Sequence, residues 1–477
     1  MLVTDSRKVK KGDTFLALRG VETDGHDYIV SAIENGASKV ICEHGSYDVE
    51  TVVVENTRKY LADYLHNMYD NKLADIKFVG ITGTNGKTTT AYLVYQMLNK
   101  LSCPTAYIGT IGFYMVNSYK ETQNTTPDLM ELYEMFDLCI KNKIEVIVME
   151  VSSHALEIGR LMGIDFDIVA FTNLTQDHLD VHGTFENYMK AKQKLFYKVK
   201  KGGKAIVNID DEYASNFLIK GNNNITYGFN KGDYQVISSK LLMNKTVFDF
   251  NYKDVIYNAE VNLLGKYNIY NYLLALIIVN RLGYDIKEIL GIKVSSPPGR
   301  FEIINYQDNV IIVDYAHTPD AMENILKCCN ELKRGNIITV IGCGGKRDKT
   351  KRPKMGDIAT KYSSYVIFTD DNPRCEDSKE ITNDIIRNLG VKNFEVINDR
   401  YEATKKAISL LNHNDMLLIL GKGHENYQII GNEKIHYSDK ETVLEIIKNS
   451  NYYFISLFKD TTFPNIISFD TIFMLIV

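Results

Sequence analysis

Short apolar runs rich in β-branched residues alternate with longer amphipathic stretches along most of the chain. Strands that alternate with helical segments are typical of βαβ units and predict a mostly parallel sheet. We therefore expect an α/β fold. The predicted strands are Lys77–Thr82, Val146–Val151, Ile168–Thr172, Ala205–Asn208, Ile311–Tyr315, Ile337–Gly342, Val366–Thr369 and Met416–Gly421.

The segment Ile225–Leu264 has a different pattern. Polar and apolar positions alternate within it, as in Thr246–Tyr252, and turn-forming residues at Asn230–Asp233 and Asn244–Lys245 separate the runs. Alternation with a period of two between turns is typical of antiparallel hairpins. We expect a small antiparallel sheet attached to the middle of the chain.

The chain is too long for a single core, because its 477 residues exceed the ~250–300 at which cores stop growing. One boundary is expected in the polar stretch Tyr69–Asp75. A second is expected at Ser295–Gly299, which contains two prolines and a glycine. The prediction is three domains, at 1–73, 74–296 and 297–449, followed by an atypical tail at 450–477.

Composition narrows the class of protein. Hydrophobic residues make up 45% and charged residues 24% of the chain, which excludes a disordered or fibrous protein. The 55 basic and 60 acidic residues give a net charge of −5, so non-specific nucleic-acid binding is not expected. The seven cysteines form no CxxC pair, which favours reduced thiols. Without a signal-like or spanning apolar segment, we expect a cytoplasmic protein with no stable membrane insertion.

A glycine-rich loop, Gly80–Thr90, lies between a predicted strand and a helix expected over Ala91–Leu101. Backbone N–H groups of such a loop, together with the helix N-terminus, bind phosphate. In this motif the lysine, Lys87, reaches the β- and γ-phosphates and the next hydroxyl, Thr88, binds Mg²⁺. The strict motif has glycine where this chain has Ile81, so the loop is a variant, and an ordinary glycine-rich turn is the less favoured alternative.

Acidic residues and histidines follow the neighbouring strands. Glu150 ends a buried run, and a carboxylate at the end of a parallel strand beside a phosphate loop commonly meets the Mg²⁺ of a nucleotide. The next strand leads into Asn173–Gly183, which contains two aspartates and two histidines. An isolated histidine is usually structural, but this concentration predicts a metal-binding role for at least one of them.

Charged residues also follow the strands of the last third of the chain. Arg300, just past the predicted linker, could bind phosphate when domains close, and Asp314 could contact a ribose or a cation. An NAD-binding fingerprint is excluded, because Arg347 occupies the position of its final glycine. Arg347, Arg374 and Glu425 are expected on one sheet edge, as a mixed-charge pocket suited to a zwitterionic amino acid.

Taken together, these motifs resemble the Mur ligase family, and most closely its members that add the third amino acid in peptidoglycan synthesis. The resemblance extends from about residue 5 to residue 447. The segments that carry it are Asp5–Arg7, Asp24–His26, Gly83–Thr89, Thr125–Asp128, Met149–Leu156, Asn173–Gly183, Asn208–Asp211, Pro298–Glu302, Asp314–Asp320, Gly342–Asp348, Lys351–Pro353, Asp371–Arg374 and Gly421–Gln428.

The resemblance implies a UDP-sugar-binding N-terminal α/β domain, a central P-loop ATPase domain and a C-terminal Rossmann-like domain that binds the amino acid. It implies ATP-dependent ligation of meso-diaminopimelate to UDP-N-acetylmuramoyl-L-alanyl-D-glutamate through an acyl phosphate, in cytoplasmic peptidoglycan precursor synthesis. Phosphoryl transfer of this kind depends mainly on Mg²⁺ and lysine to neutralise charge. A monomer is expected. Compared with the family, the N-terminal domain is expected to be short at its start.

The resemblance also implies roles for individual residues. The expected catalytic residues are Lys87, Glu150, His178 and Lys192. The expected ATP contacts are Gly83, Thr84, Asn85, Gly86, Lys87, Thr88, Thr89, Asn271, Arg300 and Asp314. The expected UDP-substrate contacts are Ser6, His26, Thr125, Thr126, Ser152 and Arg160, and the expected amino-acid contacts are Arg347, Asp371, Asn372, Arg374, Gly421 and Glu425. The expected magnesium ligands are Thr88, Glu150, His178 and a carbamylated Lys192.

Two of these expectations depend on the resemblance in different ways. From sequence alone Lys192 is interpreted as a solvated lysine on a helix face, and only the family singles it out. Arg374 also has a physical argument, because a guanidinium can pair with the distal carboxylate of diaminopimelate, which lysine lacks. Within the superfamily the alternatives are a lysine-adding ligase and a folylpolyglutamate-type ligase. Outside it they are a P-loop kinase and an inactive binding protein.

Overall fold

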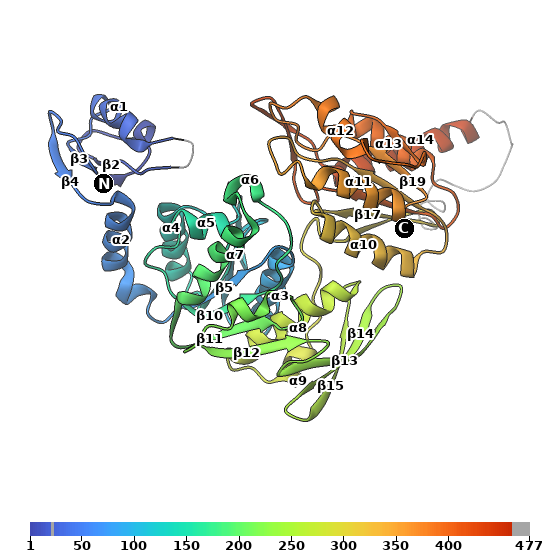
Figure 1. Cartoon of the computed structure of the whole chain (residues 1–477), viewed down its shortest axis with the longest axis horizontal. Coiled ribbons are helices and arrows are strands. Elements are labelled where there is room, and N and C mark those ends of the chain that lie inside the picture. The colour runs from blue at the N-terminus through green and yellow to red at the C-terminus, as the bar shows by residue number, and fades with distance from the viewer. Residues whose placement is uncertain (21–22, 460–477) are drawn as a thin grey trace. The chain divides into compact units, whose positions relative to one another are not determined.

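The computed structural model describes residues 1–20 and 23–459 (Figure 1). Contacts divide the chain into two compact units. The first contains Met1–Arg300, Thr318–Leu332 and Arg347–Lys351; the second contains Phe301–His317, Lys333–Lys346 and the chain from Arg352 onward. The predicted tail begins inside the last helix, α14 (Asp439–Lys459), and its remainder, 460–477, lies outside the described residues.

The first unit begins with a four-stranded sheet in which all neighbouring strands are parallel. Its strands, in spatial order, are β1 (Leu2–Val3), β2 (Thr14–Leu16), β3 (Lys39–Cys42) and β4 (Glu50–Val53). Two short 3₁₀ turns (Ser6–Lys8 and Gly25–Tyr28) and α1 (Ile29–Glu34) connect them. The helix α2 (Thr57–Leu73) then leads into the second sheet of the unit.

That second sheet has eleven strands in the order β15-β14-β13-β12-β11-β10-β5-β9-β6-β7-β8. The strands from β12 to β6 are parallel to their neighbours, as the buried apolar runs predicted. The bounds are β5 (Lys77–Thr82), β6 (Thr105–Gly109), β7 (Gly112–Met115), β8 (Ser118–Lys120), β9 (Val146–Glu150), β10 (Phe166–Phe171), β11 (Val199–Asn208), β12 (Asn223–Gly228), β13 (Tyr234–Leu241), β14 (Thr246–Tyr252) and β15 (Val255–Val261).

The expected antiparallel hairpins are present in β13, β14 and β15, but they continue the main sheet. The first run of that segment, β12, is parallel to both β11 and β13. The turn before β13 does not reverse the chain as a hairpin would, and the side chain of Asp233 instead accepts hydrogen bonds from the backbone N–H and the hydroxyl of Thr226, at 2.7 and 2.8 Å. A local turn signal therefore does not by itself determine strand direction.

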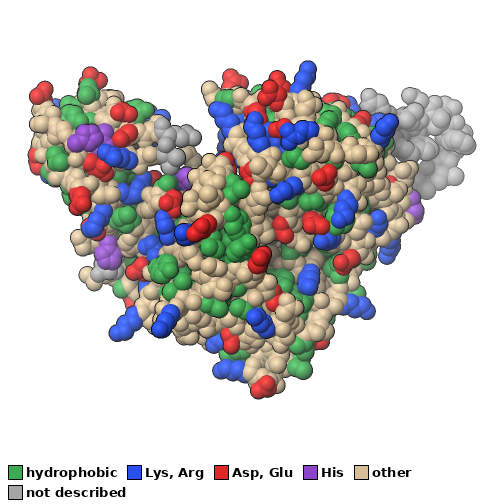
Figure 2. Space-filling view, in the orientation of Figure 1, with side chains coloured by type: hydrophobic (Ala, Val, Ile, Leu, Met, Phe, Trp, Pro, Cys, Tyr) green, Lys and Arg blue, Asp and Glu red, His purple; other side chains and the backbone are tan. Residues whose placement is uncertain are grey.

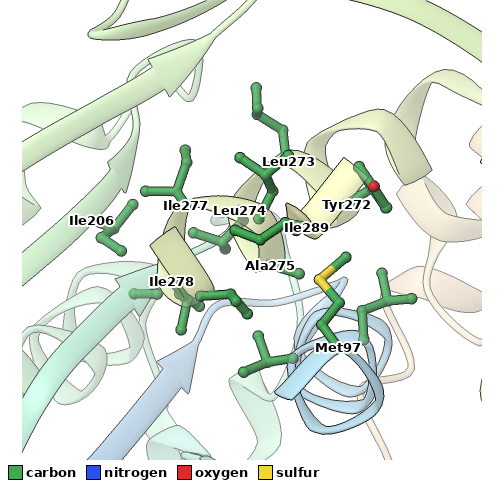
Figure 3. Close-up of a cluster of buried hydrophobic side chains, with 14 of the residues drawn as sticks. Met97, Ile206, Tyr272, Leu273, Leu274, Ala275, Ile277, Ile278 and Ile289 are labelled. Atoms are coloured by element: carbon green, nitrogen blue, oxygen red, sulfur yellow. The ribbon is translucent and has the colours of Figure 1, made fainter. Parts of the chain in front are cut away.

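Helices cover both faces of the large sheet because successive strand residues point to opposite sides. Val79 and Ile81 of β5 belong to one buried cluster and Phe78 belongs to the other. The first cluster is completed by α3 (Lys87–Lys100), α8 (Lys266–Arg281) and α9 (Ile286–Leu290), whose labelled side chains in Figure 3 meet around Leu274 and Met97. The second includes residues of α4 (Leu129–Lys141), α5 (Ser153–Glu157) and α7 (Phe185–Gln193).

The second unit contains a six-stranded sheet in the order β16-β17-β21-β18-β19-β20. Only β16 is antiparallel to its neighbour. The bounds are β16 (Glu302–Tyr306), β17 (Asn309–Asp314), β18 (Ile337–Ile341), β19 (Tyr365–Phe368), β20 (Phe394–Val396) and β21 (Met416–Leu420), with α11 (Lys351–Tyr362), α12 (Ser378–Ile386), α13 (Arg400–Ser409) and the hairpin β22 (Tyr427–Ile430) and β23 (Glu433–His436). The helix α10 (Pro319–Leu332), which follows β17 in the chain, belongs to the first unit.

The surface and the cysteines agree with the composition. Basic and acidic side chains are interspersed over the face drawn in Figure 2. All seven cysteines are free thiols; six are buried and Cys375 is exposed. Within residues 1–20 and 23–459, no helix has the length and apolar character required to cross a bilayer.

Candidate active site

The phosphate loop predicted from the sequence connects β5 to the N-terminus of α3. Two of its glycines are required by the space around them. Gly83 has φ 148° and Gly86 has φ 87°, and a Cβ at these positions would collide with the Thr172 hydroxyl and with the Asn271 side chain. The loop therefore passes very close to β10 and α8, and only glycine permits that approach.

Residues that follow β10 hold the loop in place. The N–H of Thr84 donates to the carbonyl of Asn173 at 2.8 Å, and the N–H of Asn85 donates to the Asn173 side chain at 2.9 Å. The Thr172 hydroxyl donates to the Asn85 carbonyl at 2.6 Å. These bonds fix the backbone of the loop before any ligand binds. Sequence reasoning missed Asn173 and Thr172 as loop anchors, although both lie at the predicted end of a parallel strand.

Lys87 and Thr88 lie at the start of α3, as predicted for the motif. The Lys87 ammonium donates to the carbonyls of Gly83 and Thr84, both at 2.8 Å. Burial lowers the pKa of Lys87, while the nearby Glu150 carboxylate opposes that shift. The Thr88 hydroxyl donates to Glu150 Oε2 at 2.8 Å and accepts from Arg300 Nη2 at 3.2 Å. The structure thus brings Lys87, Thr88, Glu150 and Arg300 together.

Glu150 is completely buried at the end of β9. One carboxylate oxygen accepts hydrogen bonds from the Tyr107 hydroxyl and from the N–H of Thr110, the latter at 2.9 Å. The other accepts from the hydroxyls of Thr88 and Thr110, at 2.8 and 3.2 Å. A buried charge needs such partners to offset its desolvation, so these donors orient the carboxylate.

Tyr107 was not predicted to be a functional residue. It lies on β6, next to β9, and is completely buried. Gly109 leaves room for this contact, because a Cβ there would collide with both the Tyr107 hydroxyl and Glu150. A tyrosine in a buried strand requires a hydrogen-bond partner, and that rule is the one sequence signal that could have indicated its role.

The two histidines after β10 have different surroundings. His182 is buried and lies 3.0 Å from the Ser153 hydroxyl, which is the structural role expected of most histidines. His178 has φ 53° and lies 3.4 Å from Asp177. Although 47% of its side-chain surface is accessible, the protein packed around the ring lowers the pKa of His178 to about 4. The imidazole is therefore neutral at pH 7 and can act as a ligand.

Lys192 is buried, and its interpretation as a solvated lysine from sequence alone is wrong. Its side chain is 1% exposed, donates to the Gly83 carbonyl at 2.8 Å and lies 4.4 Å from the centre of the Tyr188 ring. Helical spacing places Tyr188 and Lys192 on the same, buried face of α7. Burial, and then the charge of Lys87, lower the pKa of Lys192 well below its usual value.

Four of the predicted UDP-substrate residues lie in one network beside Glu150. The Thr126 hydroxyl donates to the Glu150 carbonyl at 2.9 Å and accepts from the N–H of Ser152 at 3.0 Å. Arg160 donates to the Thr126 carbonyl at 3.0 Å, and the hydroxyl of Thr125 lies 3.0 Å from that of Thr110. This network joins the four residues to Glu150, whose carboxylate contacts Thr88 at the start of α3.

The other two, Ser6 and His26, belong to the N-terminal sheet. His26 Nδ1 lies 2.6 Å from Asp24, and Nε2 accepts from the N–H of Glu43 at 2.9 Å. Because Nε2 is an acceptor, the proton of a neutral ring lies on Nδ1 and is donated to Asp24. His44, which was not predicted, stacks on His26 with ring centres 4.8 Å apart. Ser6 is buried, and its carbonyl accepts from Asn35 at 3.0 Å.

The remaining ATP candidates are held by neighbours of their own. Asn271 is buried in α8, and its side-chain N–H donates to Asn268 at 3.0 Å. Thr89 is buried in the first turn of α3. In the second unit, Asp314 ends β17 and accepts from the N–H groups of Phe301 and Ala316, both at 2.7 Å.

Several predicted amino-acid contacts meet at the strand ends of the second unit. Asn372 donates to Glu425 Oε2 at 2.9 Å. Arg374 donates to the carbonyls of Gly345 and Asn372, at 2.9 and 3.2 Å. Gly421 has φ 113°, and a Cβ there would lie 2.7 Å from Asp371 Oδ2. Arg347, in the loop after β18, belongs instead to the first unit and has 48% of its side-chain surface exposed.

The charged groups of the first unit could contribute to a metal site only with help from a ligand. Within the described part of the chain, no three His, Cys, Asp or Glu side chains gather closely enough to hold a metal ion by themselves. Mg²⁺ is often bound by one or two protein oxygens, with water and phosphate completing the shell. The Thr88 hydroxyl and the Glu150 carboxylate are donors of that kind.

We predict that Tyr107→Phe lowers the free energy of unfolding of the first unit by about 1–3 kcal/mol, because Glu150 loses a donor in a buried site. Urea denaturation would measure this change. Tyr92→Phe is the matched control, because the ring of Tyr92 lies 5.9 Å from that of Tyr107. Removing the Tyr92 hydroxyl should change the free energy of unfolding by no more than about 0.5 kcal/mol. Equal effects of the two substitutions would contradict the importance of the hydroxyl.

Comparison with known proteins adds evidence from sequence. Three family models match the chain: "Mur ligase family, catalytic domain" at residues 1–73, "Mur ligase middle domain" at 81–279 and "Mur ligase, glutamate ligase domain" at 299–423. A UDP-N-acetylmuramoyl-L-alanyl-D-glutamate--2,6-diaminopimelate ligase of Clostridium acetobutylicum is 43% identical, covering 93% of this chain and 94% of that protein. The ligase of the same name from Bacillus cereus is 39% identical, covering 93% of both.

Solved structures agree with this assignment. A structure of a UDP-N-acetylmuramoyl-L-alanyl-D-glutamate--2,6-diaminopimelate ligase has a TM-score of 0.66 at 31% identity and covers 94% of this chain and 95% of its own. The MurF ligase of Thermotoga maritima in complex with ADP has a TM-score of 0.64 at 21% identity and covers 94% and 97%, which supports the fold alone. With three matching family models and relatives about 40% identical over nearly the whole length, the chain belongs to the Mur ligase family.

Proposed function

We propose that this protein joins meso-diaminopimelate to UDP-N-acetylmuramoyl-L-alanyl-D-glutamate in an ATP-dependent reaction of peptidoglycan precursor synthesis. The observation that carries the proposal is a pair of oppositely charged residues, Arg374 and Glu425, at the strand ends of the second unit. Asn372 lies between them: its side chain donates a hydrogen bond to Glu425, and its carbonyl accepts one from Arg374. A diamino dicarboxylic acid presents both kinds of group. The names of the relatives at 39–43% identity support the same substrate.

The first unit supplies the groups for carboxylate activation. In the proposed reaction a carboxylate oxygen of the UDP-linked dipeptide attacks the γ-phosphorus of ATP, ADP leaves, and an acyl phosphate forms. Lys87 and the backbone N–H groups of Gly83 and Gly86 are the proposed donors to the phosphoryl oxygens, while the N–H groups of Thr84 and Asn85 are held by Asn173. Preorganised donors of this kind stabilise the charge that spreads over the transferring group.

The second half of the reaction forms the amide. The amine of the amino acid attacks the acyl carbon, the tetrahedral intermediate collapses, and inorganic phosphate leaves with its bond electrons while the nitrogen loses a proton. Arg374 and Glu425 would hold the amino acid by its carboxylate and its ammonium during this step. We propose that each region binds one substrate: residues 1–73 bind the UDP-sugar, residues 74–296 bind ATP, and residues 297–449 bind the amino acid.

The residues around Glu150 fit a nucleotide-bound Mg²⁺. A carboxylate and a threonine hydroxyl supply the hard oxygen atoms that this ion prefers, and the His178 ring is neutral at pH 7. Thr88, Glu150 and His178, together with a modified Lys192, are the proposed ligands. The ion would neutralise phosphate charge during transfer. Tyr107 and Thr110 would keep the Glu150 carboxylate oriented for this purpose.

Lys192 is proposed to carry a carbamate. Burial lowers the pKa of Lys192, which favours the neutral amine, and the neutral amine is the form whose lone pair attacks the carbon of CO₂. One N–H proton is lost to solvent, and the product is an anion. Carbamylation would replace the buried cation at Gly83 with a carboxylate-like group, which would attract Mg²⁺ instead of repelling it.

The UDP-linked substrate is proposed to bind along the network that begins at Thr125 and Thr126. Ser152 and Arg160 belong to this network, and Ser6 and His26 are the proposed contacts in the N-terminal sheet. Arginine and hydroxyl groups at these positions suit the diphosphate and peptide carboxylates of such a molecule. Because ATP is the co-substrate, the proposed site of action is the cytoplasm.

The alternatives are weaker on specific grounds. A lysine-adding enzyme would leave the Arg374 guanidinium without a substrate carboxylate, which costs binding energy. The folylpolyglutamate synthase structures share the fold at 15% identity and cover 76% of this chain, so they support architecture alone. A kinase would have no use for the Asn372–Glu425 pair. An inactive binding protein would not need the phosphate-loop lysine.

We predict that Lys87→Ala reduces turnover more than about a hundredfold, because the phosphoryl oxygens lose a buried cation. Phosphate release from ATP in the presence of UDP-N-acetylmuramoyl-dipeptide and meso-diaminopimelate would measure it. Lys141→Ala, on the partly exposed surface of α4, is the control and should leave the rate within a factor of about two. Retention of a tenth of the rate by Lys87→Ala would contradict the assignment of the loop.

We predict that Lys192→Ala is nearly inactive and is partly restored by added short carboxylates, which can occupy the place of the carbamate. Lys190→Ala is the matched control, since Lys190 is an exposed lysine on the same helix. A ¹³C-carbamate NMR signal from protein equilibrated with ¹³C-bicarbonate should be present in the wild type and absent from Lys192→Ala. Full activity of that variant, or a signal unaffected by it, would exclude the modification.

We predict that the wild-type enzyme prefers meso-diaminopimelate to L-lysine by at least about a hundredfold in kcat/KM, because the lost charge pair is worth roughly 2–5 kcal/mol. Arg374→Ala should remove most of this preference while leaving the KM for ATP nearly unchanged. An amino-acid panel scored by phosphate release tests both statements and the proposed function. Equal kcat/KM for the two amino acids in the wild type would overturn the proposal.

A further inference from the structure

A buried lysine lies within the amino-acid network of the second unit and has no assigned role. The side chain of Lys422 has zero exposed surface. Its ammonium donates to Glu425 Oε2 at 2.8 Å and to Asn372 Oδ1 at 3.1 Å. It also lies 5.5 Å from the centre of the Tyr427 ring. A completely buried lysine is rare unless it is paired, so this one is committed to the two residues that it contacts.

Lys422 determines how the Asn372 amide is oriented. The ammonium of Lys422 and the backbone N–H of Ile429, at 3.1 and 2.9 Å, both point at the same side-chain atom of Asn372. Both groups are donors only, so that atom must be the amide oxygen. The amide nitrogen is thereby left to donate to Glu425 Oε2, at 2.9 Å. The orientation of the amide therefore follows from the chemistry of its neighbours.

The same lysine determines which oxygen of Glu425 is available to a ligand. Oε2 already accepts from Lys422 and from Asn372. Within the described part of the chain, Oε1 accepts no hydrogen bond from the protein. A substrate ammonium would therefore be met by Oε1, while the hydrogen bond from Lys422 fixes the direction of the carboxylate.

Through Asn372 the network extends to the guanidinium that would bind the substrate carboxylate. The Asn372 carbonyl accepts from Arg374 Nη1 at 3.2 Å and from the N–H of Gly345 at 2.9 Å. The N–H of Arg374, which has φ 55°, donates to the carbonyl of Ile429 at 2.9 Å. Lys422 and Ile429 thus hold Asn372, which contacts both Arg374 and Glu425.

We propose that Lys422 is a positioning residue for amino-acid recognition: it does not touch the substrate, and it sets the geometry of Asn372 and Glu425 so that the ammonium and carboxylate of the amino acid are read together. This inference rests on the function proposed above. It predicts an effect confined to the amino-acid substrate, because the phosphate loop and the UDP-substrate residues belong to the other unit.

The test is steady-state kinetics of Lys422→Met, which keeps the length of the side chain and removes its charge. The KM for meso-diaminopimelate should rise about tenfold to a hundredfold, as expected for the loss of hydrogen bonds to a charged group. The KM values for ATP and for the UDP-linked dipeptide should stay within about a factor of two. Thr339→Val is the matched control, since it removes a buried 2.7 Å hydrogen bond to Ser363 elsewhere in the same unit and should change none of the three.

A second variant distinguishes positioning from a general loss of stability. If Lys422 acts through Glu425, adding Lys422→Met to Glu425→Gln should not raise the amino-acid KM beyond that of Glu425→Gln alone, because the carboxylate to be positioned is gone. The double variant also buries no unpaired charge, so it remains informative if Lys422→Met alone fails to fold. Independent, multiplicative effects of the two changes would overturn the inference, as would an unchanged KM in Lys422→Met.

The outcome for the wild type separates this inference from the proposed function. If the wild type releases phosphate in response to meso-diaminopimelate while Lys422→Met retains the wild-type KM, only the role of Lys422 is wrong. If the wild type does not respond to meso-diaminopimelate, the proposed function is wrong and the role of Lys422 falls with it. If Lys422→Met raises only the KM for the amino acid, and does not raise it further in the Glu425→Gln variant, the result supports both the proposed function and the role of Lys422.

Discussion

The buried carboxylate of Glu150 is the feature on which the geometry of the first unit depends. A charged group with no exposed surface is unfavourable unless donors surround it, and here β6, α3 and the loop after β6 all supply one. Because the donors come from separate segments, satisfying one carboxylate also fixes the distances between those segments. The phosphate loop, the Thr125–Thr126 segment and the end of β9 are therefore positioned together, before any substrate arrives.

Parallel strands explain why so much chemistry gathers at single sheet edges. In the parallel part of each large sheet, the carboxyl ends of neighbouring strands point the same way, so the loops that follow them lie at one edge. In the first unit β5, β9 and β10 deliver Lys87, Glu150 and His178 to one region. In the second unit the loops after β19 and β21 deliver Asn372 and Glu425. The same architectural rule thus gathers polar side chains in both units, for the phosphate proposed to bind in the first and the amino acid proposed to bind in the second.

The sequence was sufficient for the parallel strands and for the phosphate loop. All eight predicted strands are present, because fully buried strands have apolar, β-branched runs that differ clearly from amphipathic helices. The loop was predictable because phosphate binding restricts both its glycines and its lysine. The direction of β12 was not predictable from local turns, because its parallel pairing with β11 depends on tertiary contacts.

Buried polar contacts were the part of the site that sequence patterns could not reveal. Lys192 lies among other lysines on α7, and nothing in the spacing marks it as the buried one. Tyr107 looks like any aromatic residue of a core strand, and its value comes from a carboxylate forty-three residues away in the sequence. Such pairs depend on which strands become neighbours. They can be found only after the sheet order is known, or through resemblance to a family.

The buried lysines illustrate how the same residue type is used in different ways. Lys87 and Lys192 both contact the Gly83 carbonyl, and burial, together with the charge of Lys87, lowers the pKa of Lys192. Lys422 is instead matched by a carboxylate at 2.8 Å. Near the phosphate loop, burial and a neighbouring cation favour the neutral amine of Lys192, which is the form that the proposed carbamylation requires. At the strand ends of the second unit, the hydrogen bonds of Lys422 to Glu425 and Asn372 suit it for holding both side chains in fixed directions.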